Sequence, residues 1–350
     1  MKIAKILISI CFMTLTASAM GFATGIDAGY FFTGLAATSF IPMPKGVALM
    51  AIQKELWIND IVTNLFKSNP HLANAYNADS FVLQGKVVHI PNAGSKPNIT
   101  KNRSSFPATV VTRTDQDITF SLDEFSSEPV KIADAEHYEL SYDKRQSVMG
   151  AQNMSIAETI GDWFCYYWAP TTLAQMARTT GTTATATVGT GVRNIVMLAD
   201  IQKMQKLFNK QNIPQEGRFA LLDADMYDQL LNQLNATQYR DFSAAVNMET
   251  GIIGKLFSFN FLVPRSTVLV YDNTGTPIPY DPTQTPVAAT ANAAGLFWHQ
   301  DAVIRAIGKN DFFEALNDPQ YYGDIYSTLV RAGGRIRRYD GYGVAALVQA

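Results

Sequence analysis

The sequence predicts an α+β protein, in which extended segments and helices occupy separate stretches of the chain. Residues 81–90 read as extended, and residues 117–125 alternate apolar with polar side chains, as a strand with one buried face does. Residues 142–168 place apolar side chains on one side of a long helix. A chain of 350 residues can bury a substantial core and form one large or two ordinary domains.

Residues 1–49 differ in composition from the rest of the chain. A basic start, an apolar run over residues 6–15 and small residues at 17–19 have the pattern of a secretory signal. The Gly-rich continuation fits neither a mature secreted terminus nor a full membrane span. Helical spacing begins at Met50, and we expect translation to start there, with residues 1–49 an upstream extension. A signal-like leader is the alternative.

Further elements are expected from Met50 onward, from apolar periodicity and turn residues. They are a helix at 52–66, strands at 81–90 and 117–125, the helix at 142–168, a Thr/Gly/Ala-rich connector at 171–192, a helix at 192–208, a strand at 219–222, a helix at 224–234, sheet segments at 255–261 and 264–271, a loop at 273–286, extended text at 294–307, a helix or loop at 312–321, and strands at 324–330 and 343–348. A capping-box pattern from Ser155 to Glu158 makes a break in the long helix near Asn153 conceivable.

Composition and motifs argue against catalysis. The net charge of −2 excludes binding of nucleic acid through bulk positive charge. Cys11 and Cys165 are too few for a disulfide framework and have no metal-ligand spacing, and a chain starting at Met50 keeps only Cys165, as suits a reducing compartment. The Gly-rich stretch 181–191 lacks the Lys-Ser/Thr of a phosphate-binding loop, and GxSxG is absent. We therefore expect no enzyme activity, no catalytic residue, no metal and no cofactor, and Cys165 is interpreted as a structural thiol.

Charge is divided along the predicted hairpin. Residues 85–114 carry five basic residues and no acid, whereas residues 115–139 carry eight acids and Lys131 as the one base. Two interpretations stay open: an ordinary hairpin with solvated charges, or a basic tip that docks on the acidic segment of a neighbouring copy. The second predicts intersubunit contacts by Lys96, Lys101, Arg103, Asp115, Asp117, Glu124 and Glu128.

The order of these parts resembles the major capsid proteins of tailed double-stranded DNA bacteriophages, which have the Hong Kong 97 type fold. The segments that carry the resemblance are FVLQGKVVHIPNAG, DITFSLDEFSSEPVKI, YELSYDKRQSVMGAQNMSIAETIGDWFCYYWAP, GRFALLDADMYDQLLNQL, GKLFSFNFLVPRSTVLVYD and YYGDIYSTLVRAGGRIRRYDGYGVAALV. The resemblance covers nearly everything from Met50 and nothing before it.

The resemblance implies a division of the chain. It implies an amino-terminal arm at 50–80, an extended loop at 81–132, a peripheral domain with a spine helix at 133–189, an axial domain at 190–300, and a return to the peripheral domain with a terminal strand at 301–350.

The resemblance also implies a function: a structural subunit that self-assembles through pentamers and hexamers into the icosahedral head around the phage DNA. It implies a location in the virion after assembly in the host cytoplasm, and no membrane contact if translation starts at Met50. Expected partners are scaffolding, portal and decoration proteins and non-specifically contacted DNA, with Arg335, Arg337 and Arg338 facing that DNA or a subunit interface. An exported bacterial envelope or surface assembly protein and an encapsulin-like compartment shell are the alternatives.

Overall fold

The computed structural model describes residues 60–83, 86–92, 99–104, 106, 110, 116–133, 144–338 and 340–350. The chain divides into two compact units, Met1–Leu56 and Trp57–Ala350, and every described residue belongs to the second. The predicted leader at 1–49 therefore lies outside the described residues. Of the predicted first helix, the described part is helical over residues 60–68.

The first sheet is built around one long strand, β18 (Gly323–Ile336). It pairs antiparallel with β5 (Asp123–Ser126), β6 (Val130–Ala133), β16 (Val303–Ile307) and β17 (Asp311–Asp318), and β1 (Tyr76–Asn77) joins β16 in parallel. Alternate side chains of β18 are buried, including Tyr326, Val330 and Ala332. This alternation is what a sheet with one covered face requires.

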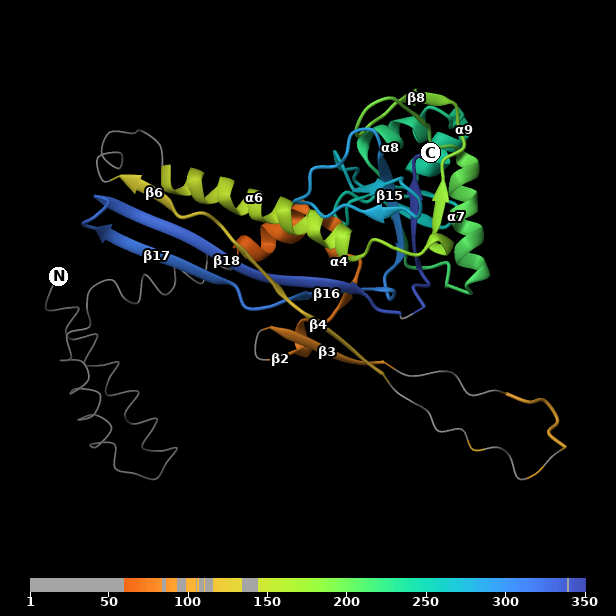
Figure 1. The fold of residues 1–350 in the computed structure, drawn as a ribbon, viewed down its shortest axis with the longest axis horizontal. Coiled ribbons are helices and arrows are strands. Elements are labelled where there is room, and N and C mark those ends of the chain that lie inside the picture. The colour runs from red at the N-terminus through yellow and green to blue at the C-terminus, as the bar shows by residue number, and fades with distance from the viewer. Residues whose placement is uncertain are drawn as a thin grey trace, which may run out of the picture. The chain divides into compact units, whose positions relative to one another are not determined.

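The predicted long helix is confirmed as α6 (Lys144–Tyr167), which lies along β18 (Figure 1). Ile156, Ile160 and Phe164 recur at every fourth residue and are buried against the sheet, because residues four apart share one helix face. The helix is continuous through Asn153, so the break considered there is wrong. Its end is followed by Pro170, which cannot donate the backbone hydrogen bond that a further turn needs.

A second sheet is centred on β15 (Ala291–His299), all nine residues of which are buried. On one side of β15 lie β10 (Arg218–Leu221), β12 (Phe259–Leu262), β11 (Ile252–Leu256), β13 (Leu269–Asp272) and β14 (Ile278–Pro279), and on the other lie β19 (Val344–Val348) and then β7 (Met176–Arg178). A strand buried along its whole length has both faces covered.

Three helices cover one face of this second sheet: α7 (Leu198–Lys210), α8 (Ala224–Leu231) and α9 (Ala236–Ser243). The opposite face packs against the C-terminal half of α6 through Trp298 and its neighbours. Helix α6 therefore packs against both sheets and contributes side chains to a hydrophobic core that the two sheets share.

The shorter elements complete the chain. They are α4 (Pro70–Ala73), η1 (Asp79–Phe81), β2 (Val82–Leu83), β3 (Val87–Asn92), β4 (Gln116–Ser121), η2 (Leu173–Gln175), β8 (Thr183–Thr185) and β9 (Val192–Asn194). The predicted pairing of the two arms of the loop is confirmed, because β3 and β4 are antiparallel neighbours with Val88 opposite Phe120. Among the helices of the described residues, none has the length and apolar character that crossing a bilayer requires.

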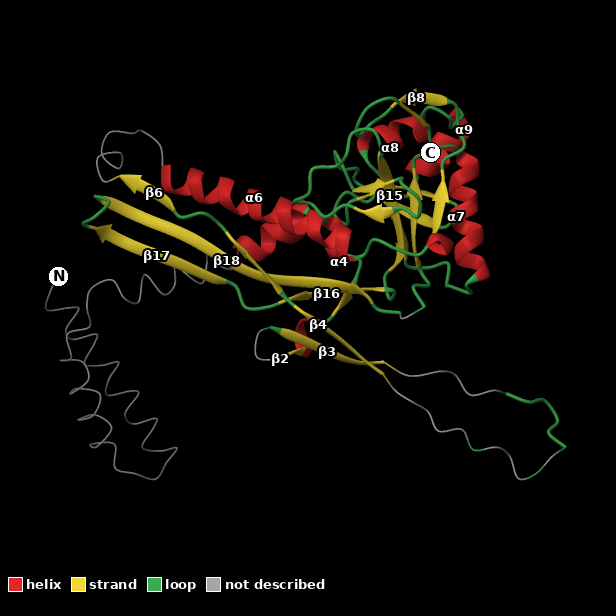
Figure 2. Ribbon diagram, viewed as in Figure 1, coloured by secondary structure: helices red, strands yellow, loops and turns green. Residues whose placement is uncertain are grey.

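Strands make up most of the chain after α9 (Figure 2), and here one prediction is wrong. Residues 312–321 were expected to be a helix or loop, yet 311–318 form β17. The segment becomes a strand because it pairs with β18 over the register from Asp311 opposite Leu329 to Asp318 opposite Gly323. Pairing with the following strand overrides a weak local preference.

Three other element boundaries differ from prediction. The helix expected over 192–208 begins only at Leu198, since its first residues form β9. The single sheet segment expected over 255–261 is a hairpin of β11 and β12, because Phe257 and Ser258 have φ of 47° and 72° and reverse the chain. The strand expected over 264–271 begins at Leu269.

The two glycines of α6 have contrasting surroundings. A Cβ on Gly161 would lie 2.0 Å from Asn69 Oδ1 and 2.5 Å from Arg265 Nη1, whereas no described atom lies within 4 Å of a Cβ on Gly150. Asn69 is fixed by its hydrogen bond to Ala157 O at 2.7 Å. Helix propensity favours alanine at both positions by about 1 kcal/mol.

We expect Gly161→Ala to lower the free energy of unfolding by about 2 kcal/mol, because overpacking outweighs propensity. Gly150→Ala is expected to raise it by about 0.5–1 kcal/mol. Urea unfolding of unassembled subunits measures both. A stabilised Gly161→Ala variant would contradict the packing that the structure gives to this face of α6.

Candidate assembly interface

The end of α6 holds the two sheets together. The buried Trp168 donates from Nε1 to Ile304 O at 3.0 Å, on β16 of the first sheet. Its ring lies 5.8 Å from the ring of Trp298, on β15 of the second sheet, and 5.9 Å from the ring of His71. Phe164 and Trp168 of the aromatic run at the end of the long helix are therefore core, whereas Trp163, Tyr166 and Tyr167 are partly exposed.

The core contains two groups that can be reactive in other proteins, the thiol of Cys165 and the imidazole of His71, and here both are held in their neutral forms. Cys165 is buried 3.9 Å from His71 Nε2, and burial raises the pKa of its thiol to about 12. Burial, helped by Arg265, lowers the pKa of His71 to about 3, so the imidazole is neutral at neutral pH. A neutral His beside a protonated thiol does not make a nucleophile. The interpretation of Cys165 as structural agrees with this environment.

A cavity of about 670 Å³ lies between α6 and residues 265–286. Arg265 forms part of its wall, with Nη2 2.6 Å from Asp162 Oδ1 and Nη1 2.8 Å from Asn69 Oδ1. Burial raises the pKa of Asp162, against the influence of Arg265. These polar groups satisfy one another, and the described part of the chain brings no three His, Cys, Asp or Glu side chains together as a metal ion would require.

The basic tip of the extended loop is described over residues 99–104 and is exposed. Lys101 and Arg103 lie on it, next to apolar side chains that solvent reaches almost fully: Ile99 is 96% exposed and Phe106 77%. Lys96 and Asp115 lie outside the described residues. The tip therefore combines positive charge with unburied apolar surface.

Most of the acidic residues that were predicted to contact a neighbouring subunit lie where the extended loop joins the rest of the chain. Asp117 is on β4 opposite Pro91, and Glu128 is exposed on the surface after β5. Glu124 has two partners in its own chain: Arg331 Nε at 3.1 Å and Lys86 Nζ at 3.3 Å. Arg331, followed by Lys86, lowers the pKa of Glu124. Glu124 is therefore already paired with two cations of its own chain, and its contact with a neighbouring subunit stays a prediction.

The three C-terminal arginines also contact their own chain. Arg335 donates to Thr119 O at 3.0 Å and so ties β18 to β4. Arg337 lies 4.1 Å above the ring of Tyr76, and Arg338 is 2.9 Å from Asp340. Arg335 and Arg338 remain exposed, whereas Arg337 is half-buried.

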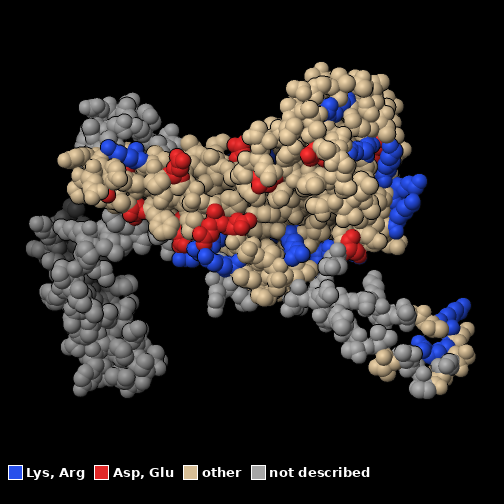
Figure 3. Space-filling model, viewed as in Figure 1, with Lys and Arg blue, Asp and Glu red and all other residues tan. Residues whose placement is uncertain are grey.

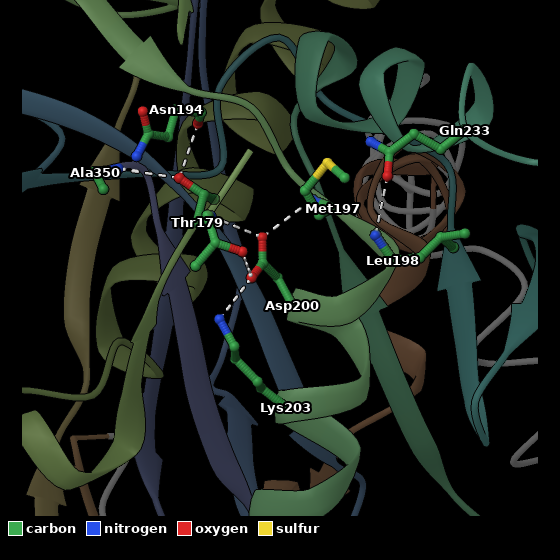
Figure 4. Close-up of polar contacts among 9 residues, drawn as sticks. Thr179, Asn194, Met197, Leu198, Asp200, Lys203, Gln233 and Ala350 are labelled. Carbon is green, nitrogen blue, oxygen red and sulfur yellow. Dashed lines mark hydrogen bonds and ion pairs between the residues drawn. The ribbon is translucent and has the colours of Figure 1, made fainter. Parts of the chain in front are cut away.

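Sequence reasoning missed a polar cluster at the start of α7 (Figure 4). The buried Asp200 accepts hydrogen bonds from the backbone N of Met197 and Thr180, both at 3.0 Å, and from Lys203 Nζ at 2.9 Å. Burial opposes ionisation of Asp200, but these donors outweigh it and lower its pKa. Nearby, Thr179 Oγ1 donates to Asn194 O at 2.8 Å and accepts from Ala350 N at 3.1 Å. The cluster therefore fixes α7 and the C-terminus to the 171–192 connector.

One signal in the sequence points to this cluster. Asp200 is the third residue of α7, where a carboxylate reaches back to the free backbone N–H groups of a helix start. The same logic applies to α9, which sequence reasoning did not predict. There Asn235 and Gln238 cap each other's backbone N–H groups, at 2.9 and 3.1 Å.

A match between the middle of the chain and a protein-family model establishes the family to which the chain belongs. Residues 145–337, more than half of the 350, match the model described as "Phage capsid protein". This chain belongs to the phage capsid protein family. It is a structural capsid protein, as the resemblance in the sequence predicted, and the envelope-protein and compartment alternatives are not favoured.

Solved capsids share the fold of this phage capsid protein. The capsid of cyanophage P-SCSP1u is 16% identical with a TM-score of 0.55, over 79% of this chain and 86% of that one. The capsid of Ralstonia phage GP4 is 13% identical with a TM-score of 0.56, over 79% and 86%. The capsid of a native GTA particle is 10% identical with a TM-score of 0.51, over 79% and 88%. These likenesses confirm the predicted α+β, Hong Kong 97 type fold. No curated protein matches the chain significantly.

Proposed function

We propose that this phage capsid protein is the major subunit of a phage head. Copies assemble as pentamers and hexamers into an icosahedral shell around double-stranded DNA, after folding in the host cytoplasm. The match of residues 145–337 to the capsid family carries this proposal. A shell of many copies needs only contacts of ordinary size, repeated around a closed surface.

The subunit architecture supports this role. Trp168 and its neighbours join both sheets through one core, so a force on one sheet reaches the other without a flexible linker. We propose the arm at 50–80, the extended loop at 81–132, the peripheral domain at 133–189, the axial domain at 190–300 and the return at 301–350. Strands β7 and β19 pair into the same sheet as the axial strands, although both lie outside 190–300.

We further propose that the loop tip contacts a neighbouring subunit. Exposed Phe106 and Ile99 gain from burial, and Lys101 and Arg103 orient the contact toward acidic surface. Among the predicted acids, Asp115, Asp117 and Glu128 stay candidates for the receiving surface. Glu124 is the weakest candidate, because Arg331 and Lys86 already neutralise it within its own chain.

The remaining partners are proposed from family membership. Scaffolding, portal and decoration proteins would contact the assembled shell, and DNA would be contacted non-specifically. Arg335 and Arg338 are exposed and can face DNA or another subunit, while Arg337 is engaged with Tyr76.

Reversal of the loop-tip charges tests the proposal. The wild-type chain, expressed from Met50, is expected to form shells visible by negative-stain electron microscopy. A variant with Lys96, Lys101 and Arg103 changed to Glu is expected to stay soluble and folded but to form no shells, because the tip then repels an acidic surface. Reversal of Lys67, Lys131 and Lys309 changes the charge equally outside the tip and serves as control. Absence of any assembly by the wild type contradicts the proposed function, and normal shells from the tip variant contradict only the role of the tip.

A further inference from the structure

The cavity between α6 and residues 265–286 has the size of a small-molecule site. Its volume of about 670 Å³ falls within the range of about 300–1,000 Å³ that such sites occupy. One wall is the exposed side of α6, and the opposite wall includes the loop at residues 280–286, which follows β14. A ligand in this cavity would therefore touch both the long helix and the second sheet.

The lining of the cavity has an excess of negative charge. It contains the carboxylates of Glu158, Asp162 and Asp281 but, among the described residues, a single base, Arg265. The guanidinium of Arg265 is already occupied, because it donates to Asn69 and Asp162 and to the backbone O of Glu158. No cation of the described residues pairs with the side chains of Glu158 or Asp281. Figure 3 shows acidic atoms along the course that α6 takes in Figure 1. Two unpaired carboxylates, one on each wall, are thus available to a cationic ligand.

Asp281 is fixed in place before any ligand binds. Its Oδ1 accepts hydrogen bonds from the backbone N and from Oγ1 of Thr283, both at 2.6 Å. These bonds lower the pKa of Asp281, so its carboxylate is ionised at neutral pH. The turn also holds Gln284, whose Oε1 accepts from the backbone N of Asp281 at 3.3 Å. The loop therefore presents a negative charge to the cavity at a defined position.

The rest of the lining suits an alkyl chain. Apolar and aromatic surface comes from side chains that include Met154, Tyr166, Val270, Tyr280, Pro282 and Pro286. Methylene groups gain from burial on such surface, and the face of an aromatic ring attracts an ammonium group. A hydrated metal ion could use the carboxylates but would gain nothing from this apolar surface. The lining therefore favours an organic cation over an inorganic one.

We propose that this cavity binds an aliphatic polyamine, a flexible chain that carries several ammonium groups. One ammonium pairs with Glu158 on α6 and another with Asp281 on the opposite wall, through charge-assisted hydrogen bonds. The methylene chain lies on the apolar and aromatic lining between the ammonium groups. Because the ligand binds the folded chain, it also stabilises the subunit against unfolding. The inference goes beyond the proposed function and does not depend on it, since one subunit contains the whole site.

Calorimetric titration of unassembled, full-length subunits with spermidine tests the proposal. At an ionic strength of about 0.15 M, where exposed charges are largely screened, we expect one spermidine to bind per subunit and to raise the Tm. Butylamine keeps the alkyl chain but has a single ammonium, and it should bind at least tenfold more weakly. An equal concentration of MgCl2 should leave most of the spermidine bound, because Mg²⁺ cannot use the apolar lining.

Three variants test whether the ligand binds at this cavity. E158Q/D281N keeps the shape of both side chains and an acceptor for Thr283 but removes both charges, and it should weaken spermidine binding at least tenfold. D241N/E249Q removes two charges from exposed positions outside the cavity, and its affinity should stay within twofold of the wild type. Met154→Lys adds a cation at a position that is 66% exposed, four residues before Glu158 on the same helix face, and should also weaken binding at least tenfold.

Several outcomes overturn the inference. They are no binding of spermidine by the folded wild type, equal affinities of the wild type and E158Q/D281N, equal affinities for spermidine and butylamine, and complete displacement by MgCl2. Binding of a peptide with the sequence of residues 96–106 in place of spermidine also overturns it, because the cavity is then a protein contact. If E158Q/D281N misfolds, Met154→Lys decides, since its substitution is on the surface. Shell formation plays no part in these titrations, so a wild type that fails to assemble contradicts the proposed function alone.

Discussion

Trp168→Ala is expected to lower the free energy of unfolding by about 3–5 kcal/mol, the usual cost of deleting a fully buried aromatic side chain. The change removes the ring contacts with Trp298 and His71 and leaves Ile304 O without its donor. Because these contacts join α6 to both sheets, the loss should also loosen one sheet relative to the other. Chemical unfolding of unassembled subunits gives the energy, and hydrogen exchange at β16 reports the loosening.

Two comparisons isolate the cause. Trp168→Phe keeps most of the ring but loses the N–H donor, and should cost less than the alanine variant. Trp163→Ala removes a partly exposed tryptophan of the same helix and should cost clearly less than Trp168→Ala, since less of its surface is buried. Equal losses at positions 163 and 168 would show that Trp168 does not join the sheets.

Arg218→Ala is expected to lower the free energy of unfolding by a similar amount, about 3–5 kcal/mol. Arg218 is fully buried, and its guanidinium lies against the rings of Phe208 and Phe259, at 5.5 and 5.9 Å from their centroids. It donates to Ile213 O at 2.6 Å and Pro214 O at 2.7 Å. Removing it creates a cavity and leaves the buried carbonyl of Ile213 unsatisfied, which costs about 1–3 kcal/mol.

The matched change is Arg240→Ala in α9. Arg240 is exposed and pairs only with the neighbouring Asp241 among the described residues, so its loss should change the free energy of unfolding by no more than about 0.5 kcal/mol. Arg218→Met keeps the contact with the rings and should fall between the two. A near-neutral Arg218→Ala would mean that water or relaxation replaces the lost donors.

The sequence predicted where charged residues lie along the candidate surfaces, but it did not predict which residues they contact. The division between a basic loop and an acidic return strand can be counted along the chain, but the partner of each charge cannot. Glu124 and Arg331 are 207 residues apart and meet because β5 pairs with β18. Glu124 is thereby paired within its own chain, which the count of charges along the sequence does not reveal.

Local periodicity was sufficient for the α+β class, the long helix α6 and the strand character of the two loop arms, because periodicity depends on neighbours within a few residues. The pairing of those arms, with Val87 opposite Ser121, is not local. Family resemblance came from the order of those parts. The strand β17 and the hairpin of β11 and β12 depend on pairing with the next strand, and the polar cluster at Asp200 depends on Thr180 in the preceding connector. Only the tertiary structure could decide them, since pairing across a sheet and burial of a carboxylate are set by which segments meet in the folded chain.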